Sequence, residues 1–134
     1  MNITGETTHL IELKKQVKDF VTARDWNKYH NPLNLALSIS VEAAELLEKF
    51  QWKDETAIAT MLKEPLEQVA LRDELADVMV YCLSLANSLN IDVSQAIIEK
   101  LRKNEVKYPV NLVKGEYRKY TELKPQKITK RRTK

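Results

Sequence analysis

Two pairs of acidic residues, each pair three positions apart, are the groups in this chain most suited to chemistry. They are Glu42 with Glu45 and Glu74 with Asp77, and both pairs occur in otherwise apolar segments. Positions i and i+3 share one face of a helix, so each pair concentrates negative charge. Carboxylates that lose water repel one another unless a cation joins them. Because oxygen-only ligands suit Mg²⁺, with Mn²⁺ as a substitute, the pattern predicts a divalent metal site.

Acid pairs on helices more often belong to solvated faces, where a basic residue one turn away balances them. That interpretation fits this chain poorly. Four positions after Glu42, Glu74 and Asp77 the chain has uncharged residues, and only Glu45 is followed there by a lysine, Lys49. The usual support within the helix is therefore missing for three of the four acids.

Two other kinds of metal site agree less well with the sequence. A di-iron bundle needs Glu-x-x-His motifs on paired helices. Glu6 precedes His9 by three positions but lies outside the central helices, and His30 follows no such glutamate. Zinc is disfavoured by two distant histidines and a single cysteine, Cys82. Cys82 lies in an apolar run, where we expect a small core residue of a protein in a reducing compartment.

The helices that must hold these acids follow from the hydrophobic pattern. Only two glycines occur and alternating β patterns are missing, so hairpins and glycine-rich phosphate loops are not expected. The apolar residues follow helical periods. We expect an all-α fold, an antiparallel four-helix bundle, with long helices over about 8–25, 32–50, 65–89 and 92–108 and a short helix over 55–63.

Local signals mark where three of these helices begin. Asn31 followed by Pro32 is typical of an N-cap with proline at the first helical position. Pro65 is a second such start, and Asp92 with Gln95 resembles a capping box. These signals make the starts of the helices better defined than their ends.

Polar residues form one stripe on each of the two central helices. Nearly everything else in these helices is apolar, so each helix should be buried on most sides. The stripes are then expected to line an internal cleft or a subunit junction. They consist of Asn34, Ser38, Glu42 and Glu45 on one helix, and of Glu74, Asp77, Tyr81, Ser84 and Ser88 on the other.

The net charge of +3 comes from the C-terminal end of the chain. Residues 124–134 carry six basic residues and no acids, which leaves 16 basic and 19 acidic residues, a net charge of −3, in residues 1–123. We expect one domain over residues 1–123 and a basic, flexible tail over 124–134. No apolar run is long enough to span a bilayer and no signal pattern opens the chain, so we expect a cytoplasmic protein with no membrane partner.

Some basic and aromatic residues could serve a nucleotide. Lys100, Lys103 and Lys107 share a helix face and could together neutralise a polyphosphate, although for each residue alone a solvated surface is the better interpretation. Trp26 and Trp52 flank the second predicted helix. They either cap the core or form a stacking pocket for a base, and the spacing favours neither interpretation.

Taken together, these residues resemble the MazG superfamily of all-α nucleoside triphosphate pyrophosphohydrolases, and within it the dCTP pyrophosphatase-like branch. Both acid pairs, both tryptophans and the Lys-Tyr-Pro end occur in the same order. The resemblance extends over about residues 10–123. The segments that carry it are Arg24-Asp25-Trp26, His30, Asn34-Leu35, VEAAELLEKFQW ending at Trp52, DELADVMVY ending at Tyr81, Asn104, Tyr108-Pro109 and Arg118 to Leu123.

The resemblance implies Mg²⁺-dependent hydrolysis of a (deoxy)nucleoside triphosphate between its α and β phosphates, which yields a monophosphate and pyrophosphate. It also implies a homo-oligomer, a dimer or a dimer-of-dimers tetramer, with shared active sites. The acids Glu42, Glu45, Glu74 and Asp77 would hold the metal and carry the catalysis. The substrate-binding residues would be Trp26, His30, Asn34, Trp52 and Tyr81 around the base and sugar, and Lys100, Lys103, Asn104 and Tyr108 at the phosphates.

One position departs from the family pattern. Where some members have a polar, base-reading side chain on the first helix, this chain has Val17. The resemblance therefore does not name the preferred base, and a related substrate such as dUTP or phosphoribosyl-ATP stays open. The non-enzymatic alternative is a helical interaction module whose basic tail binds nucleic acid or another acidic partner. We do not expect a nucleic-acid partner, because terminal basic runs are more often only solubilising.

Overall fold

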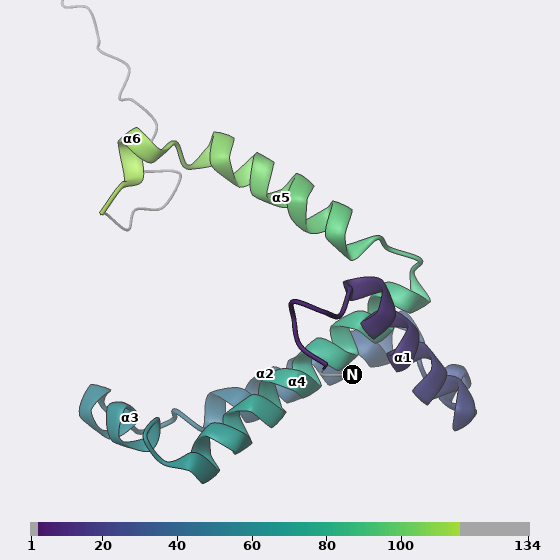
Figure 1. The fold of residues 1–134 in the computed structure, drawn as a ribbon, viewed down its shortest axis with the longest axis horizontal. Helices are drawn as coiled ribbons and strands as arrows, with labels where there is room; N and C mark the ends of the chain where they lie inside the picture. Colours follow the sequence, from purple (N-terminus) through teal and green to yellow (C-terminus); the bar gives the residue numbers. More distant parts are fainter. Residues whose placement is uncertain (1–2, 116–134) are drawn as a thin grey trace, which may run out of the picture. The chain divides into compact units, whose positions relative to one another are not determined.

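The computed structural model describes residues 3–115, and every regular element in this part of the chain is a helix. The predicted all-α class is therefore confirmed. Four long helices lie within a few residues of their predicted ranges, and the short helix before Pro65 is also present (Figure 1). The elements are α1 Leu10–Ala23, η1 Trp26–Lys28, α2 Pro32–Glu48, α3 Glu55–Met61, α4 Pro65–Ser88, α5 Val93–Lys107 and α6 Val110–Val113.

The helix starts follow the local signals in the sequence. The side chain of Asn31 caps α2 by accepting a hydrogen bond of 2.9 Å from the backbone N–H of Asn34. Pro32 and Pro65 occupy the first helical positions of α2 and α4, where a missing N–H costs nothing. Asp54 caps α3 in the same way as Asn31 caps α2, over 2.8 Å. The start of α2 is thus marked by a side-chain cap and a proline, and the start of α4 by a proline alone.

Two short helices were not predicted. The 3₁₀-helix η1 lies in the segment that breaks the helical period after α1, and Asp25 before it adopts a left-handed backbone with φ of 53°. The four-residue α6 follows Pro109. Helices of three or four residues bury no complete hydrophobic stripe, so they leave no periodic pattern in the sequence.

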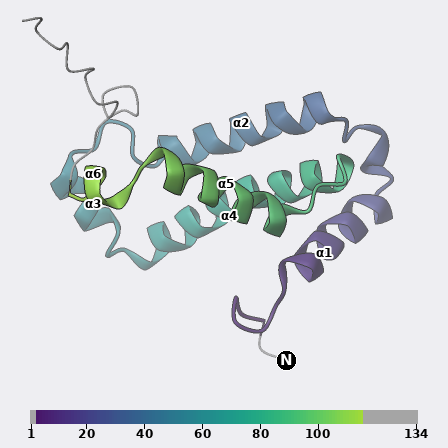
Figure 2. The ribbon, with the colours of Figure 1, turned by 90° about the horizontal axis from the view of Figure 1, so that it is seen from above.

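The described part of the chain divides into two compact units, residues 3–92 and 93–115. In the first unit, α2 and α4 lie side by side along their length (Figures 1 and 2). They are antiparallel, because Ser88 at the end of α4 donates a hydrogen bond to the carbonyl of His30, just before α2. The start of α1 lies against the end of α4, where the Asn87 amide donates to the carbonyl of Lys14 over 2.9 Å.

The core of this unit is formed where α1, α2 and α4 meet. Leu35 of α2 is 1% exposed, and Val21 of α1 and Leu83 and Ala86 of α4 are buried too. Ser84 of α4 is buried as well. This core aligns the polar stripes of α2 and α4, which brings their acids to the same level.

The second unit is described here by itself. It contains α5 and α6, and within α5 the side chains of residues 100, 103, 104 and 107 recur at helical spacing on one face. Three predictions lie outside the described residues, namely the basic tail over 124–134, the domain boundary at residue 123 and the segment Arg118 to Leu123. None of the described helices is long and apolar enough to cross a membrane.

Candidate active site

Three of the four predicted acids form a compact cluster between α2 and α4. Glu42, Glu45 and Glu74 each offer a carboxylate oxygen, and these oxygens lie within 4.8 Å of one another. Glu42 and Glu74 are partly buried, whereas Glu45 is exposed. Asp77 lies one turn beyond Glu74 on α4 and is exposed. The antiparallel pairing of the two helices therefore converts two distant sequence motifs into one carboxylate site.

The pKa of Glu42 lies above its ordinary value of 4.5, because of the surroundings of this residue in the cluster. Burial of the carboxyl group is the largest cause, followed by the charges of Glu45, Asp77 and Glu74. Asp77 is thus close enough to act on Glu42, although it is not among the three residues of the tight cluster. A group of this kind is stabilised by a bound cation, and its oxygen-only donors fit a hard divalent metal.

Lys49 also belongs to this region. The sequence placed it four residues after Glu45 on the same helix, but its ammonium pairs with Glu74 on α4, over 3.2 Å. The side chains of Lys49 and Glu74 are 30% and 19% exposed. The pair therefore connects the C-terminal end of α2 to the acid cluster across the helix interface.

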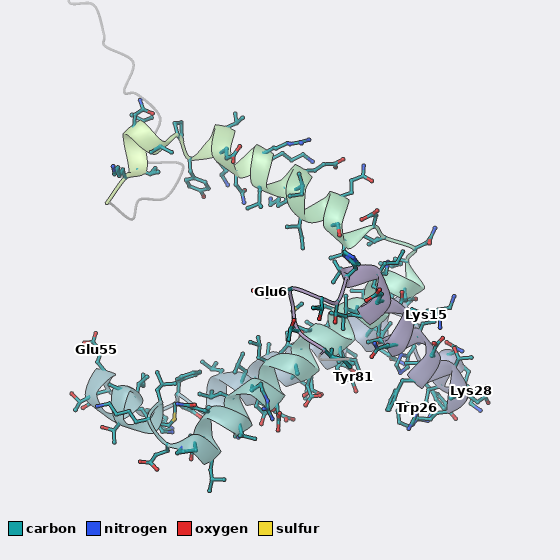
Figure 3. The ribbon with its side chains drawn as sticks, viewed as in Figure 1. Glu6, Lys15, Trp26, Lys28, Glu55 and Tyr81 are labelled. Carbon is teal, nitrogen blue, oxygen red and sulfur yellow. The ribbon has the colours of Figure 1, made fainter. Side chains whose placement is uncertain are left out.

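A cavity of about 520 Å³ opens beside the acids, between α1, η1 and α4. Asp77 and Tyr81 belong to its wall on the α4 side, and Trp26 of η1 closes another part of it. Figure 3 shows Trp26 and Tyr81 on these two elements. Its full lining is Gln16, Val17, Phe20, Val21, Trp26, His30, Asp77, Val80, Tyr81 and Ser84. Asp77 lines the cavity and its charge also raises the pKa of Glu42, so this residue connects the cavity wall with the carboxylate cluster.

Trp26 is held in place by its neighbours. Its ring meets that of Phe20 edge to face, with centroids 5.9 Å apart. The guanidinium of Arg24 lies 3.6 Å from the centroid of Phe20 and 5.9 Å from that of Trp26. Such contacts orient an aromatic side chain that is still 43% exposed. Trp26 therefore presents a fixed ring face that is free to stack on a ligand.

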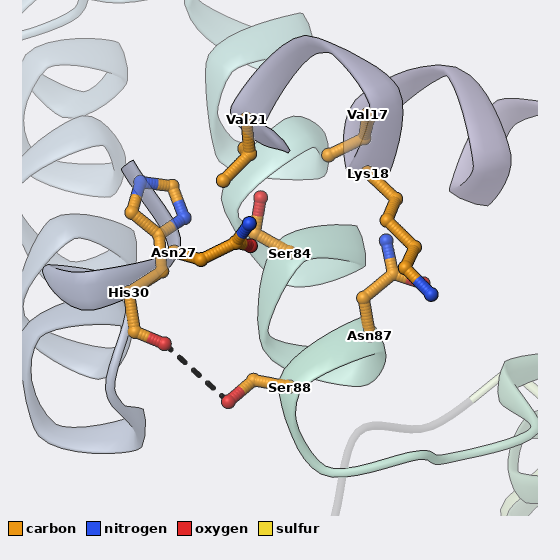
Figure 4. Close-up of a pocket in the computed structure, with 8 residues that line it drawn as sticks. All are labelled: Val17, Lys18, Val21, Asn27, His30, Ser84, Asn87 and Ser88. Carbon is orange, nitrogen blue, oxygen red and sulfur yellow. Dashed lines mark hydrogen bonds between the residues drawn. The ribbon is translucent and has the colours of Figure 1, made fainter. Parts of the chain in front are cut away.

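A smaller cavity of about 160 Å³ adjoins the first one and shares Val17, Val21, His30 and Ser84 with it. Figure 4 shows its lining, in which the ring of His30 and the amide of Asn27 lie near Ser84. The carbonyl of His30 accepts a hydrogen bond of 3.4 Å from Ser88 (Figure 4). The remaining lining residues are Lys18, Asn27, Asn87 and Ser88.

Two predicted substrate residues lie outside both cavities. Asn34 uses its amide to donate a hydrogen bond of 2.9 Å to the carbonyl of Tyr29, so it fixes the turn before α2. Trp52 is 94% exposed and has a left-handed backbone with φ of 63°, which a large side chain rarely adopts. Within a single copy of the first unit, neither residue lines the space that holds Trp26 and Tyr81.

The predicted phosphate-binding residues belong to the second unit. Lys100 and Lys103 are exposed on α5, and Asn104 is partly buried. The backbone N–H of Tyr108 donates to the carbonyl of Asn104 over 2.7 Å, and the ammonium of Lys107 lies 5.3 Å from the Tyr108 ring. The structure groups these residues at one end of α5, and their role toward a substrate stays a prediction.

Several cavity residues were not singled out from the sequence. Gln16, Phe20, Asn27 and Asn87 line the cavities, although none belongs to a recognisable motif. Phe20 follows the helical period of α1, which by itself indicates a core-facing side chain and not a cavity wall. The turn of η1 brings Asn27 toward α4, and no periodic pattern in the sequence encodes that turn.

Comparison with known proteins identifies the family of this chain. The model of the MazG-like family matches residues 37–123, a segment that contains both acid pairs. The chain therefore belongs to the MazG-like family, as its resemblance predicted.

Individual relatives are consistent with this assignment. The chain is 40% identical over 114 residues to dCTP pyrophosphatase 1 of Mus musculus and 37% identical to that of Homo sapiens. Each alignment covers 85% of this chain and 67% of the relative. Among solved structures, a pyrophosphatase from Archaeoglobus fulgidus is 39% identical, with a TM-score of 0.70 over 81% of this chain and 99% of that one.

Proposed function

We propose that this protein is a nucleoside triphosphate pyrophosphohydrolase that converts dCTP or a related pyrimidine deoxynucleotide to its monophosphate and pyrophosphate. The proposal rests on what meets at Asp77 and Tyr81 of α4. There a carboxylate cluster suited to a cation adjoins a cavity with an aromatic wall. The names of the mouse and human relatives and of the archaeal structure support the same reaction class. Such an enzyme would act on the cytoplasmic nucleotide pool.

Mg²⁺ is the cofactor that the donor set favours, with Mn²⁺ as a substitute. Glu42, Glu45 and Glu74 would hold it, with Asp77 as the fourth acid, because oxygen donors that leave room for water suit a small hard cation. When bound, the metal would supply Lewis-acid polarisation of the phosphate and a more acidic water.

The cavity residues would bind and orient the nucleoside. Trp26 would stack on the base, which an aromatic face stabilises by about 1–3 kcal/mol. Tyr81 lies one turn after Asp77 on α4, so it would set the distance between the sugar and the acids. Val17 and Val21 give the inner wall an apolar surface, while His30 and Ser84 add polar groups at the junction of the two cavities.

The reaction would break the bond between the α-phosphorus and the oxygen that bridges to the β-phosphorus. A water oxygen forms the new bond to the α-phosphorus, and pyrophosphate leaves with the bridging oxygen. Glu45 is the exposed member of the cluster and is the acid we assign to accept the water proton. Lys100, Lys103, Asn104 and Tyr108 of the second unit are the groups we assign to the departing phosphates.

We also propose that the active enzyme is a homo-oligomer, a dimer or a dimer-of-dimers tetramer. Trp52 is the main support, because an aromatic ring that is 94% exposed needs a contact that a single copy of the first unit does not supply. Apolar side chains of α2 that are more than half exposed give the same indication, namely Leu33, Leu37, Val41 and Leu47. Light scattering coupled to size exclusion measures the assembly, and a monomer at assay concentrations would contradict this part of the proposal.

The reaction class is tested by incubating the protein with Mg²⁺ and a panel of deoxynucleoside and nucleoside triphosphates, then separating the products. We expect monophosphate and pyrophosphate, and loss of turnover when EDTA removes the metal. In ¹⁸O-labelled water, the label should appear in the monophosphate. Diphosphate with orthophosphate would place the cleavage at another bond and refute the proposed reaction.

A matched pair of variants links that activity to the cluster. Glu45→Gln removes an acid of the cluster, whereas Glu48→Gln makes the same chemical change on an exposed glutamate of α2 outside the cluster. We expect E45Q to lower kcat by at least about 100-fold and E48Q to keep the wild-type rate. Equal rates for the two variants would show that the carboxylate cluster is not the active site.

A further inference from the structure

The ion pair between Lys49 and Glu74 differs from the other ion pairs described in this protein. It joins two helices, and its side chains are only 30% and 19% exposed. The pairs within α1 and near η1, Lys15–Asp19 and Lys28–Asp25, join near neighbours whose side chains are 55–83% exposed. Water therefore screens the Lys49–Glu74 pair less than it screens those surface pairs.

The partner of Lys49 is a member of the carboxylate cluster. Glu74 shares the 4.8 Å cluster with Glu42 and Glu45, so three carboxylates lie close together at this point. Among the residues that the structure describes, Lys49 is the cation paired with a cluster carboxylate. Its single positive charge offsets part of the repulsion between three acids, in the place where a divalent metal would offset more.

A lysine and a metal cannot share this position without interference. The Oε1 atom of Glu74 lies 3.2 Å from the ammonium of Lys49. A metal that binds Glu74 competes for the same carboxylate, and two cations held at one carboxylate also repel each other. An ammonium has no lone pair, so Lys49 cannot itself be a metal ligand.

The position of Lys49 in the fold allows the ammonium to leave. Lys49 is the C-cap residue of α2, with ordinary right-handed backbone angles. Its carbonyl accepts a hydrogen bond of 2.7 Å from the exposed ammonium of Lys53, and this bond does not involve the Lys49 side chain. The lysine side chain is a flexible four-carbon stem, so its ammonium can move away while the helix end stays in place.

We infer that Lys49 is a resident counter-ion of the acid cluster, which a divalent metal must displace from Glu74 before the site fills. Lys49 then stabilises the metal-free protein and weakens metal binding at the same time. It sets the metal concentration at which the enzyme becomes active. This inference rests on the proposed function, because it takes the cluster to be a metal site.

The test compares Lys49→Met with Lys53→Met, which removes the same charge from the same turn but contacts no acid of the cluster. Mg²⁺ and Mn²⁺ binding are measured by calorimetry without nucleotide, and the melting temperature is measured in EDTA. For K49M we expect a Kd for the metal that is about three- to tenfold lower than that of the wild type. We also expect a metal-free Tm that is lower by about 2–4 °C, while K53M changes neither quantity to this extent.

Lys49→Arg provides the second variant, because it keeps a positive charge beside Glu74. We expect its metal affinity to lie closer to the wild type than that of K49M. If the wild type binds metal and K49M binds it equally or less tightly, Lys49 is not a competing counter-ion and the inference is wrong. If the wild type binds neither metal, the metal site of the proposed function fails instead, so the two failures can be told apart.

Discussion

Replacing Glu42 by glutamine should make the metal-free protein more stable, although it removes a residue of the active site. Two unit charges 4.8 Å apart repel by about 0.9 kcal/mol in bulk water and by about 3.5 kcal/mol at an effective dielectric constant of 20. The cluster oxygens lie within this distance. Because Glu45 is exposed and Glu42 only partly buried, the value for water is the closer one.

Within the cluster, the variant loses the repulsions of Glu42 with Glu45 and Glu74, and it also loses the interaction of Glu42 with Asp77. The expected gain in the free energy of unfolding is about 1–2 kcal/mol in the absence of metal. For a chain of this length, that gain corresponds to a rise in Tm of about 3–8 °C. The ion pair between Lys49 and Glu74 does not involve Glu42 and should persist in the variant.

The pH dependence of stability gives an independent measure of the same effect. The pKa of Glu42 is raised by folding, so the folded protein binds this proton more tightly than the unfolded chain does. The contribution of Glu42 to the free energy of unfolding of the metal-free wild type should therefore fall as the pH rises from about 4.5 through the raised pKa. Glu42→Gln removes this group, so the fall should be smaller in the variant.

The assay is thermal or urea unfolding in EDTA across this pH range, repeated at pH 7 with saturating Mg²⁺. Glu48→Gln is the control, because it neutralises an exposed glutamate of α2 outside the cluster. With Mg²⁺ present the order should reverse, since the wild type gains binding energy that E42Q has lost. An E42Q protein that is no more stable than the wild type in EDTA at pH 7 would refute the electrostatic reasoning.

Three further predictions concern the site and the core. Asp77→Asn should lower kcat by at least about 100-fold while leaving the metal-free Tm close to that of the wild type, because Asp77 is exposed; a fully active variant would remove this acid from the mechanism. Trp26→Ala should weaken nucleotide binding by about 1–3 kcal/mol, measured as Kd with a non-hydrolysable analogue, and an unchanged Kd would argue against base stacking at this ring. Leu35→Ala should lower the free energy of unfolding by about 2–5 kcal/mol in urea titrations, because Leu35 is 1% exposed in the core, and a smaller loss would mean that the site collapses around the cavity.

The sequence predicted the helices well because the information for them is local. Asn31 and Pro32 mark the start of α2, and Pro65 marks the start of α4. The two acid motifs were also visible locally, as carboxylates without counter-ions on their own helix. The two motifs lie on the polar stripes of neighbouring helices in a bundle, so the sequence predicts that the acids face a common interface.

Other parts of the site depend on packing that no local pattern encodes. The sequence paired Lys49 with Glu45, one turn away, whereas the ammonium lies on Glu74 of the neighbouring helix. That choice depends on the register of α2 against α4. The cavity wall from α1 depends on how far α1 overlaps α4, so Gln16 and Phe20 gave no signal of their own.

The backbone of Trp52 bears on how this protein would change under selection. A left-handed residue with a β-carbon is less stable than glycine by about 1–2 kcal/mol, and the φ of 63° at Trp52 places a bulky ring at such a position. A variant library sorted for thermal stability alone should therefore replace Trp52 early, with glycine or asparagine favoured. A library sorted for turnover should retain the tryptophan if its ring serves the reaction. The difference between the two outcomes would separate what this turn contributes to folding from what it contributes to the enzyme.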